Sequence, residues 1–358
     1  FRSQNLLTIM FFISPVLLVF SLFFTHCWKT DGMLITLSLL IVGLMLLVYA
    51  SDRLVYGASV FAQSLKLPPA VIGIVIVGMG TSLPELFVAT DAAIHNLPEI
   101  AIGTAIGSSL TNLLLIAGIG AMIYPMNIQS AVLKKELPLM IIVILLAGLV
   151  VSNGHLGLRE GCLLFFIGFA SLFLMIKMLH KTLTQVRHVL PLETLSRFEL
   201  QTNPRNSVAL FWVVIALLII PVATRMIIDN VFIIMQQYHL SSFLVGLTLL
   251  SIGTSLPELA TTVVAALRRE NELALGNIIG ANIFNLTFVL GMPALLSPST
   301  FNMQAFYFSF TVLVVAGLLF SLFSLGRKQR LNRGKGIFLL VCFIVYITVL
   351  CVAHSLLT

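Results

Sequence analysis

Two copies of a seven-residue motif place residue types that bind cations inside apolar segments of the chain. The sequence G-T-S-L-P-E-L occurs at 80–86 and again at 253–259. Each proline lacks a backbone N–H, and its ring crowds the carbonyl four residues earlier, so each copy predicts a break in a helix. Carbonyls freed within a membrane must be buried in protein or line a polar cavity, and a cation is their natural partner. In this chain they are the carbonyls around Gly80, Thr81, Gly253 and Thr254.

The glutamates Glu85 and Glu258 directly follow the two prolines. A carboxylate near the middle of a membrane helix is costly unless it is paired, hydrated or protonated. A structural ion pair is the alternative, but neither copy has a Lys or Arg at an equivalent depth. Two such carboxylates repel each other, and a bound cation relieves the repulsion. We therefore interpret Glu85 and Glu258 as cation ligands.

Two further stretches, at 103–113 and 276–286, supply oxygen donors. They read G-T-A-I-G-S-S-L-T-N-L and G-N-I-I-G-A-N-I-F-N-L. Glycines four residues apart allow helices to approach closely, which by itself is only a packing motif. The oxygen-bearing side chains that follow these glycines are Ser108, Asn112, Asn282 and Asn285. Carboxylate, carbonyl, hydroxyl and amide oxygens favour Ca²⁺ or Na⁺ over soft metals.

The composition indicates a polytopic membrane protein. Hydrophobic residues make up 59% of the 358 residues and charged residues only 9%, whereas about a quarter of a soluble domain is charged. The net charge of +7 comes from basic clusters between apolar runs, which disfavours a nucleic-acid partner. The sequence has no C-x-x-C pair, no H-x-x-x-H pair and no nucleophile–base motif beside the glutamates. We therefore predict that the protein is not an enzyme and has no cofactor. The predicted partners are inorganic cations and the lipid bilayer, and no obligate protein partner is evident.

Ten apolar segments from Met33 onward are long enough to cross a bilayer, which predicts an all-α fold. They are about 34–56, 69–94, 99–124, 137–152, 158–179, 207–236, 241–267, 273–296, 303–326 and 335–356. Most Lys and Arg residues follow the odd-numbered segments, so the positive-inside rule places the polar stretch 180–206 in the cytoplasm. Residues 1–32 form an N-terminal extension, interpreted as an extra membrane helix, an uncleaved signal-like segment or translated upstream sequence.

Matching residues recur 173 positions apart, so the chain consists of two homologous halves. The matches are Gly73 with Gly246, Glu85 with Glu258, Gly103 with Gly276, Gly107 with Gly280 and Asn112 with Asn285. The halves are 33–179 and 207–358, joined by the linker 180–206. Because each half has an odd number of crossings, the second enters the membrane from the opposite face, which predicts inverted repeats. Inverted repeats can open one central site to either side in turn.

With these motifs in place, the sequence resembles the cation/Ca²⁺ antiporter superfamily, the sodium/calcium exchangers, and most closely its bacterial inner-membrane branch. The resemblance covers about 33–358 and rests on G-T-S-L-P-E at 80–85 and 253–258, with the glycine-rich stretches at 103–112 and 276–285. It implies ten core helices in two inverted five-helix repeats, of which the second, third, seventh and eighth enclose the ions. It further implies an antiporter in the bacterial cytoplasmic membrane that exchanges Ca²⁺ for Na⁺.

The resemblance also implies a role for each matching position. Glu85 and Glu258 become the central cation ligands, and the backbone carbonyls of Thr81 and Thr254 become Ca²⁺ ligands. The surrounding Na⁺ sites or the shared central site then take in Ser82, Ser255, Ser108, Asn112 and Asn285.

Four positions depart from the family pattern. Some members carry aspartate at the position of Asn285 and serine at that of Ala281, and some have alanine where this chain has Gly78 and Ser251. Two glutamates neutralise one Ca²⁺, but three Na⁺ would leave excess positive charge. A two-Na⁺ cycle is one alternative, and a proton-coupled cycle is another because H⁺ competes with metal for a desolvated carboxylate. A cation/H⁺ antiporter is therefore the second hypothesis, K⁺ is a further candidate ion, and a passive channel is less favoured.

Overall fold

A computed structural model describes residues 31–64, 80–127, 133–186, 206–267, 271–301, 303–325 and 330–357. Nearly all of the predicted extension 1–32 and most of the predicted linker 180–206 lie outside these ranges. Gly73 and Gly78 of the first half, together with the loop arginines Arg268 and Arg269, lie outside them as well.

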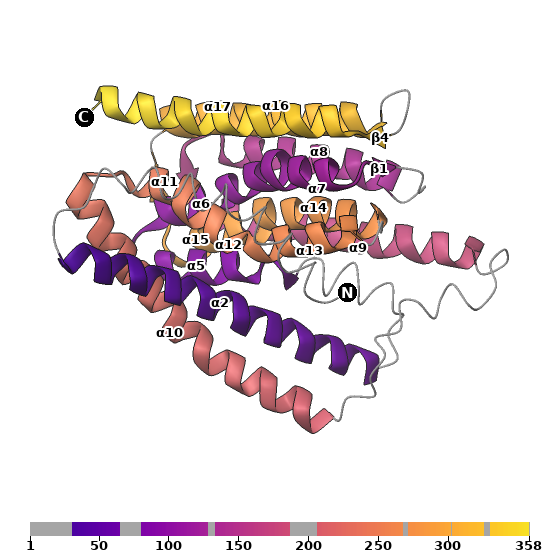
Figure 1. The fold of residues 1–358 in the computed structure, drawn as a ribbon, viewed down its shortest axis with the longest axis horizontal. Helices are drawn as coiled ribbons and strands as arrows, with labels where there is room; N and C mark the ends of the chain where they lie inside the picture. The colour runs from indigo at the N-terminus through magenta and orange to yellow at the C-terminus, as the bar shows by residue number, and fades with distance from the viewer. Residues whose placement is uncertain are drawn as a thin grey trace.

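The described residues are almost entirely helical (Figure 1), as the apolar segments predict. The helices of the first half are α2 (Asp31–Ser64), α5 (Leu83–Ile94), α6 (Pro98–Leu110), α7 (Ala117–Ile123), α8 (Leu133–Val151) and α9 (Leu158–Val186). Those of the second half are α10 (Asn206–Tyr238), α11 (Ser242–Val245), α12 (Ser251–Thr254), α13 (Leu256–Leu267), α14 (Asn271–Phe284), α15 (Leu290–Leu296), α16 (Met303–Leu325) and α17 (Arg333–Leu357). Three π-helical segments interrupt them, at Thr111–Ile116, Gly246–Leu250 and Asn285–Val289.

In the described part of the chain, seven helices are long and apolar enough to cross a membrane, and a bent pair brings the number to eight. The seven are Met33–Arg53, Pro98–Ile123, Leu158–Met178, Ser207–Tyr238, Ala274–Leu296, Phe306–Ser324 and Arg333–Val352, and the bent pair is Ser242–Thr254 with Leu256–Leu267. The predicted segment 69–94 begins outside the described residues. The predicted segment 137–152 is helical and lies in α8, which carries three charged residues in its first turn, Lys134, Lys135 and Glu136.

Helices α2 and α10 lie side by side along one edge of the molecule, and α16 and α17 lie along the opposite edge (Figure 1). Gly43 permits the close approach of α2 to α10: a Cβ atom there would lie 3.0 Å from Ile227 Cγ1 and 3.4 Å from the carbonyl oxygen of Ala223. Between these two edges lie the helices that carry the repeated motifs.

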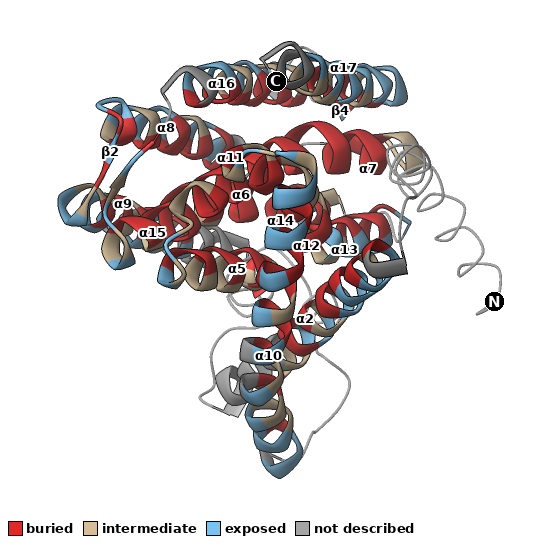
Figure 2. Cartoon of the chain, turned by 90° about the vertical axis from the view of Figure 1, so that its left-hand side faces the viewer, coloured by how far each residue is buried: buried red, intermediate tan, exposed pale blue. Residues whose placement is uncertain are grey.

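Two helices form the buried centre of the fold. In the apolar windows of Pro98–Ile123 and Ala274–Leu296, 83% of the residues are buried, compared with 22–39% in the other five spanning helices. Figure 2 shows the buried residues running along α6 and α7, while α10 and α17 expose residues on their outer sides. Exposed apolar side chains on the outer helices are suited to contact with lipid.

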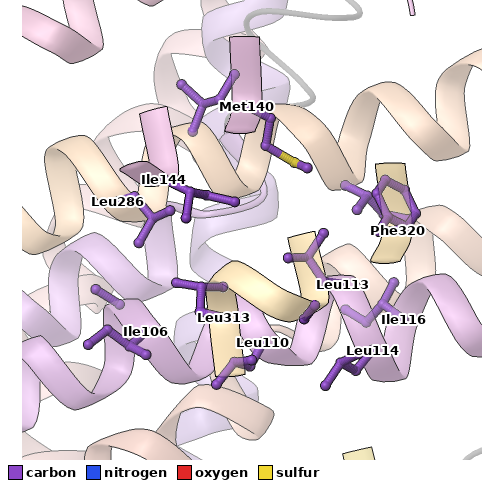
Figure 3. Close-up of a cluster of buried hydrophobic side chains, with 14 of the residues drawn as sticks. Ile106, Leu110, Leu113, Leu114, Ile116, Met140, Ile144, Leu286, Leu313 and Phe320 are labelled. Atoms are coloured by element: carbon purple, nitrogen blue, oxygen red, sulfur yellow. The ribbon is translucent and has the colours of Figure 1, made fainter. Parts of the chain in front are cut away.

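An apolar cluster packs the outer helices α8 and α16 against the two central helices (Figure 3). Leu113 and Leu286 occupy matching positions in the two halves, and both are fully buried among Met140, Ile144 and Leu313. Because lipid is as apolar as leucine, this cluster stabilises the fold through close packing and dispersion more than through removal of apolar surface from water.

Contacts between elements recur in matching pairs. Helix α17 packs on α7 as α9 packs on α15, and α5 contacts α15 as α13 contacts α7. Two short antiparallel ribbons likewise form a matching pair, because each joins a strand of the first half to a strand of the second. Strand β1 (Met126–Asn127) pairs with β4 (Arg330–Leu331), and β2 (His155–Leu156) pairs with β3 (Ser299–Thr300). Because α8 connects β1 to β2 and α16 connects β3 to β4, the two ribbons close opposite ends of the α8–α16 pair.

Candidate cation-binding site

Both heptads break their helix at the serine that precedes Leu-Pro-Glu. Ser82 has φ −87° and ψ 11°, and Ser255 has φ −83° and ψ 12°. In the second copy the helix axis bends by 43° between the segments on either side of Ser255. Prolines Pro84 and Pro257 have no N–H to donate to the carbonyls four residues earlier, which accounts for the break. The predicted interruption is therefore confirmed for the second copy. In the first copy Ser82 has the same conformation, and the residues before Gly80 lie outside the described ranges.

Crossed hydrogen bonds join the two heptads. The Ser82 hydroxyl donates to Glu258 Oε1 over 2.7 Å, and the Ser255 hydroxyl donates to Glu85 Oε1 over 2.8 Å. Both glutamate side chains are fully buried. The serine at each break thus binds the carboxylate of the other copy, and the two carboxylates lie in one buried centre.

The second oxygen of each carboxylate accepts no hydrogen bond from the described residues. Glu85 Oε2 and Glu258 Oε2 are buried and have no hydrogen-bond partner within the described structure. No ion pair among the described residues involves either glutamate. Buried carboxylate oxygens without a partner are costly. The structural ion pair considered as an alternative is therefore not present in the described part of the chain, and both oxygens are placed to accept a cation.

The surroundings of the two carboxylates differ by one hydroxyl group. Glu85 interacts with the hydroxyls of Ser255, Thr254 and Ser108, whereas Glu258 interacts with those of Ser82 and Thr81. The residue that matches Ser108 in the second half is Ala281, which has no oxygen to offer. The hydroxyl that Ser108 provides near Glu85 therefore has no counterpart near Glu258.

Asn112 and Asn285 are fully buried and lie at the start of two π-helical segments. Neither the amide nitrogen nor the amide oxygen of either side chain has a hydrogen-bond partner in the described structure. Single π-helical turns inside α-helices occur frequently at functional sites, because the extra residue redirects side chains. Sequence reasoning identified both asparagines but missed the π-helical turns. The sequence signal for these turns was a polar residue at matching positions of two apolar segments.

Asn282, the remaining predicted donor, binds its own helix. Its amide nitrogen donates to the carbonyl of Ile278 over 2.7 Å, and its oxygen is buried without a partner. No described contact joins it to either glutamate. A residue that sequence reasoning missed, Asn277, contacts both heptads through hydrogen bonds with Thr81 and with the carbonyl of Glu258.

The glycines of α6 bring it against the backbone of the second half. A Cβ atom at Gly103 would overlap the carbonyl oxygen of Phe243, and one at Gly107 would overlap that of Leu247. Gly246 lies equally close to the carbonyl of Ile100. Gly103 and Gly107 therefore act in close packing, as their spacing predicts, and the Ser108 hydroxyl beside them donates to the carbonyl of Ser251 over 3.5 Å. The same prediction is wrong for Gly276 in the second half, where an added Cβ atom would have no atom within 4 Å.

The charges away from the centre form ion pairs and ring contacts. Arg225 Nε lies 3.0 Å from Asp229 Oδ2, and the Arg225 guanidinium also contacts His95. On α2, the Arg53 guanidinium lies 2.8 Å from the Asp52 carboxylate and over the ring of Trp212. In the described part of the chain, both arginines therefore take part in ion pairs away from the two glutamates.

Comparisons with known proteins agree with the motifs. The family model described as sodium/calcium exchanger protein matches residues 35–177 and 208–352. Inner membrane protein YrbG of Escherichia coli (strain K12) is 41% identical over 89% of this chain and 97% of its own length. Sodium/calcium exchanger MaX1 of Methanosarcina acetivorans is 27% identical over 87% of this chain and 97% of its own length.

A solved structure of the sodium-calcium exchanger NCX_Mj, soaked with Na⁺ and Sr²⁺, superposes on the fold with a TM-score of 0.61 at 27% identity. The superposition covers 88% of this chain and 98% of that one. The residues that the family model matches include both heptads and their partner helices. Motif, fold and family model agree, and the chain belongs to the sodium/calcium exchanger protein family.

Proposed function

We propose that this protein is a secondary active antiporter that exchanges Ca²⁺ for Na⁺ across the bacterial cytoplasmic membrane by alternating access at a central site. The observation that carries the proposal is the pair of crossed Ser–Glu hydrogen bonds, which brings two buried carboxylates together. Among the described residues, one oxygen of each carboxylate has no partner. Membership of the sodium/calcium exchanger protein family supports these two ions as the substrates.

The proposed ligand set follows the oxygen donors around the centre. Glu85 and Glu258 supply charge, and the backbone carbonyls of Thr81 and Thr254 complete the Ca²⁺ ligands, since each lies at a helix break. Hydroxyl and amide oxygens form the Na⁺ sites or share the central one, and these are Ser82, Ser255, Ser108, Asn112 and Asn285. Oxygen donors of these types suit hard cations.

Exchange follows from the charge of the site. One Ca²⁺ neutralises both carboxylates, and so do two Na⁺, whereas the empty site holds two buried like charges that repel. Because both ions require the same carboxylate oxygens, binding of one excludes the other. A site that reorients only when neutralised would move Ca²⁺ one way and Na⁺ the other, which is the condition for coupled transport.

We further propose that ten core helices form two inverted five-helix repeats, 33–179 and 207–358, with the linker 180–206 in the cytoplasm. Three observations support this arrangement: the constant spacing of 173 residues, the matching pairs of helix contacts, and the two ribbons at opposite ends of α8 and α16. Inverted repeats build similar pathways on both sides of one central site.

The direct test is ⁴⁵Ca²⁺ uptake by purified protein reconstituted into liposomes. An outward Na⁺ gradient is expected to drive uptake above the level seen when choline replaces Na⁺, and collapse of the Na⁺ gradient is expected to abolish the excess. Uptake that ignores Na⁺ would contradict the proposed coupling. Unitary currents in a planar bilayer would instead identify a channel.

A cation/H⁺ antiporter is the second candidate, and a specific feature favours it. The neutral side chain of Asn285 and the absence of oxygen at Ala281 leave two carboxylates in the centre, so fewer cations can be balanced at once. The same liposomes distinguish the two functions. A pH gradient without Na⁺ drives Ca²⁺ uptake only if protons are the counter-ion.

A further inference from the structure

Asn277 of α14 makes a set of contacts that its counterpart in the first half does not make. Its amide oxygen accepts a hydrogen bond from the Thr81 hydroxyl at 3.2 Å. Its amide nitrogen donates to the backbone carbonyl of Glu258 and to the hydroxyl of Thr262, each at 3.3 Å. One buried side chain thus joins the break of the first heptad to the glutamate of the second.

The matching positions in the first half lack this connection. Thr104 stands where the second half has Asn277, and its hydroxyl donates to Ile100 in its own helix. Thr254, which matches Thr81, donates to Leu250 in its own helix. Ala89 stands where the second half has Thr262 and has no polar side-chain atom. In the described structure, the crossed serine bonds occur on both sides, whereas a bridge between the heptads through a third helix, as Asn277 makes it, exists on the Glu258 side alone.

We propose that Asn277 is a positioning residue that fixes the distance between the cation ligands of the two halves and so sets the affinity of the site for Ca²⁺. The proposal rests on the proposed function, because Glu258 and the Thr81 carbonyl are the ligands it positions. Asn277 holds the main chain at Glu258 through the carbonyl and holds Thr81 through its hydroxyl. The site keeps a close arrangement of oxygens only while both contacts persist.

The link compensates for the missing hydroxyl on the Glu258 side. Ala281 offers no oxygen there, whereas Ser108 interacts with Glu85. A divalent ion needs several oxygens at fixed short distances, and its affinity falls when a ligand is free to move. A monovalent ion is held by weaker forces and loses less. Loss of Asn277 is therefore expected to reduce Ca²⁺ affinity more than Na⁺ affinity.

The test compares Asn277→Ala with Thr104→Ala, the matched change in the first half. Removal of three neutral hydrogen bonds is expected to raise the KM for Ca²⁺ about tenfold for Asn277→Ala, with the maximal rate within about twofold. Thr104→Ala is expected to leave KM within about twofold, because its hydroxyl serves only its own helix. A KM for Asn277→Ala within the same range as Thr104→Ala would overturn the proposal.

Direct binding separates this proposal from the proposed function. Calorimetric titration of Ca²⁺ into detergent-purified protein measures Ca²⁺ affinity whether or not Na⁺ drives transport. A wild-type protein that binds Ca²⁺ without exchanging it would contradict the proposed function, and the effect of Asn277→Ala on Ca²⁺ affinity could still be measured.

If Asn277→Ala does not fold, Thr81→Val and Thr262→Val each remove one hydrogen-bond partner of Asn277 while keeping the shape of the side chain. Each is expected to weaken Ca²⁺ binding about threefold, and unchanged affinity in both would refute the role.

Discussion

At the scale of single residues, two buried carboxylates define the centre, and no cationic side chain among the described residues pairs with either. Each receives one serine hydrogen bond from the opposite heptad, and one oxygen of each has no partner in the described part of the chain. The serine bonds orient the carboxylates without neutralising them, because a hydroxyl donates a hydrogen bond, keeps its proton and carries no charge. The arrangement is therefore suited to reversible binding of ions rather than to permanent structural pairing.

The glutamates provide the first prediction. Glu85→Gln and Glu258→Gln each remove one negative charge while keeping the shape of the side chain, so each is expected to reduce Ca²⁺ transport by at least about a hundredfold. ⁴⁵Ca²⁺ flux in liposomes measures the loss. Asp52→Asn is the matched control, because its side chain is 64% exposed and its loss leaves the centre intact. Substantial flux in both glutamine variants would mean that the two carboxylates do not share a site.

Asn285 provides the second prediction, which concerns the counter-ion. In the proposed site, Asn285→Asp adds a third carboxylate to those of Glu85 and Glu258. The site could then balance one more positive charge, and the Hill coefficient for Na⁺ is expected to rise. The measurement is the dependence of Ca²⁺ flux on Na⁺ concentration. Asn112→Asp, at the matching position in the first half, shows whether the effect depends on the half. An unchanged ion profile for Asn285→Asp would mean that position 285 does not face the site.

The two glutamates and their proximity were accessible from the sequence, because identical heptads in homologous halves predict a shared site. The crossing of the serine bonds was not, since it depends on how the halves face each other and on which way each side chain turns at the break. Asn277 escaped notice for a related reason. Its importance lies in three contacts with residues from both halves, and its match, Thr104, gives no hint of them.

At the scale of elements, the π-helical turns pack against the helices that follow the breaks: Asn285–Val289 contacts α5, and Thr111–Ile116 contacts α13. The prolines predict the breaks because they remove a backbone donor. The π-helical turns at Asn112 and Asn285 have no comparable chemical marker, because they follow from tertiary packing against the neighbouring helices. Helix α6 is held against the second half by glycines that leave no room for a side chain.

The third prediction tests that contact. A methyl group at Gly107 would overlap the carbonyl oxygen of Leu247 and lie 2.7 Å from Ser251 Cβ. Because backbone atoms cannot move aside as a flexible side chain can, Gly107→Ala is expected to destabilise the protein by about 3 kcal/mol. Thermal unfolding of the purified protein in detergent measures the loss.

Gly334→Ala is the control for Gly107→Ala, because Gly334 is exposed and a methyl group there would have only Asn332 Oδ1 within 4 Å, at 3.7 Å. It is expected to be neutral or slightly stabilising, since alanine favours a helix more than glycine does. Equal melting temperatures for Gly107→Ala and the wild-type protein would show that α6 can withdraw from the second half at no cost.

At the scale of the whole molecule, the proposed inversion of the halves follows from an odd number of crossings, and the ribbons make it testable. Helix α8 has 19 residues, a length of about 28 Å, and it separates β1 from β2. The hydrocarbon core of a bilayer is about 30 Å thick. The ribbon β1–β4 and the ribbon β2–β3 should therefore lie on opposite sides of the membrane. The positive-inside rule predicts that this ribbon faces the cytoplasm, because Arg330, Arg333 and Lys335 lie in or near β4.

The fourth prediction locates both ribbons with an impermeant maleimide. His155 of β2 and Arg330 of β4 are exposed, so His155→Cys and Arg330→Cys, each in a background whose four native cysteines are replaced by serine, give one reactive thiol each. His155→Cys is expected to react in intact spheroplasts and Arg330→Cys only in everted vesicles, because the reagent cannot cross the bilayer. The background protein without cysteine controls for other reactions, and full labelling after detergent shows that both thiols are reactive. Labelling of both variants from one side would place the ribbons on the same face, and the two halves could then not be inverted around one central site.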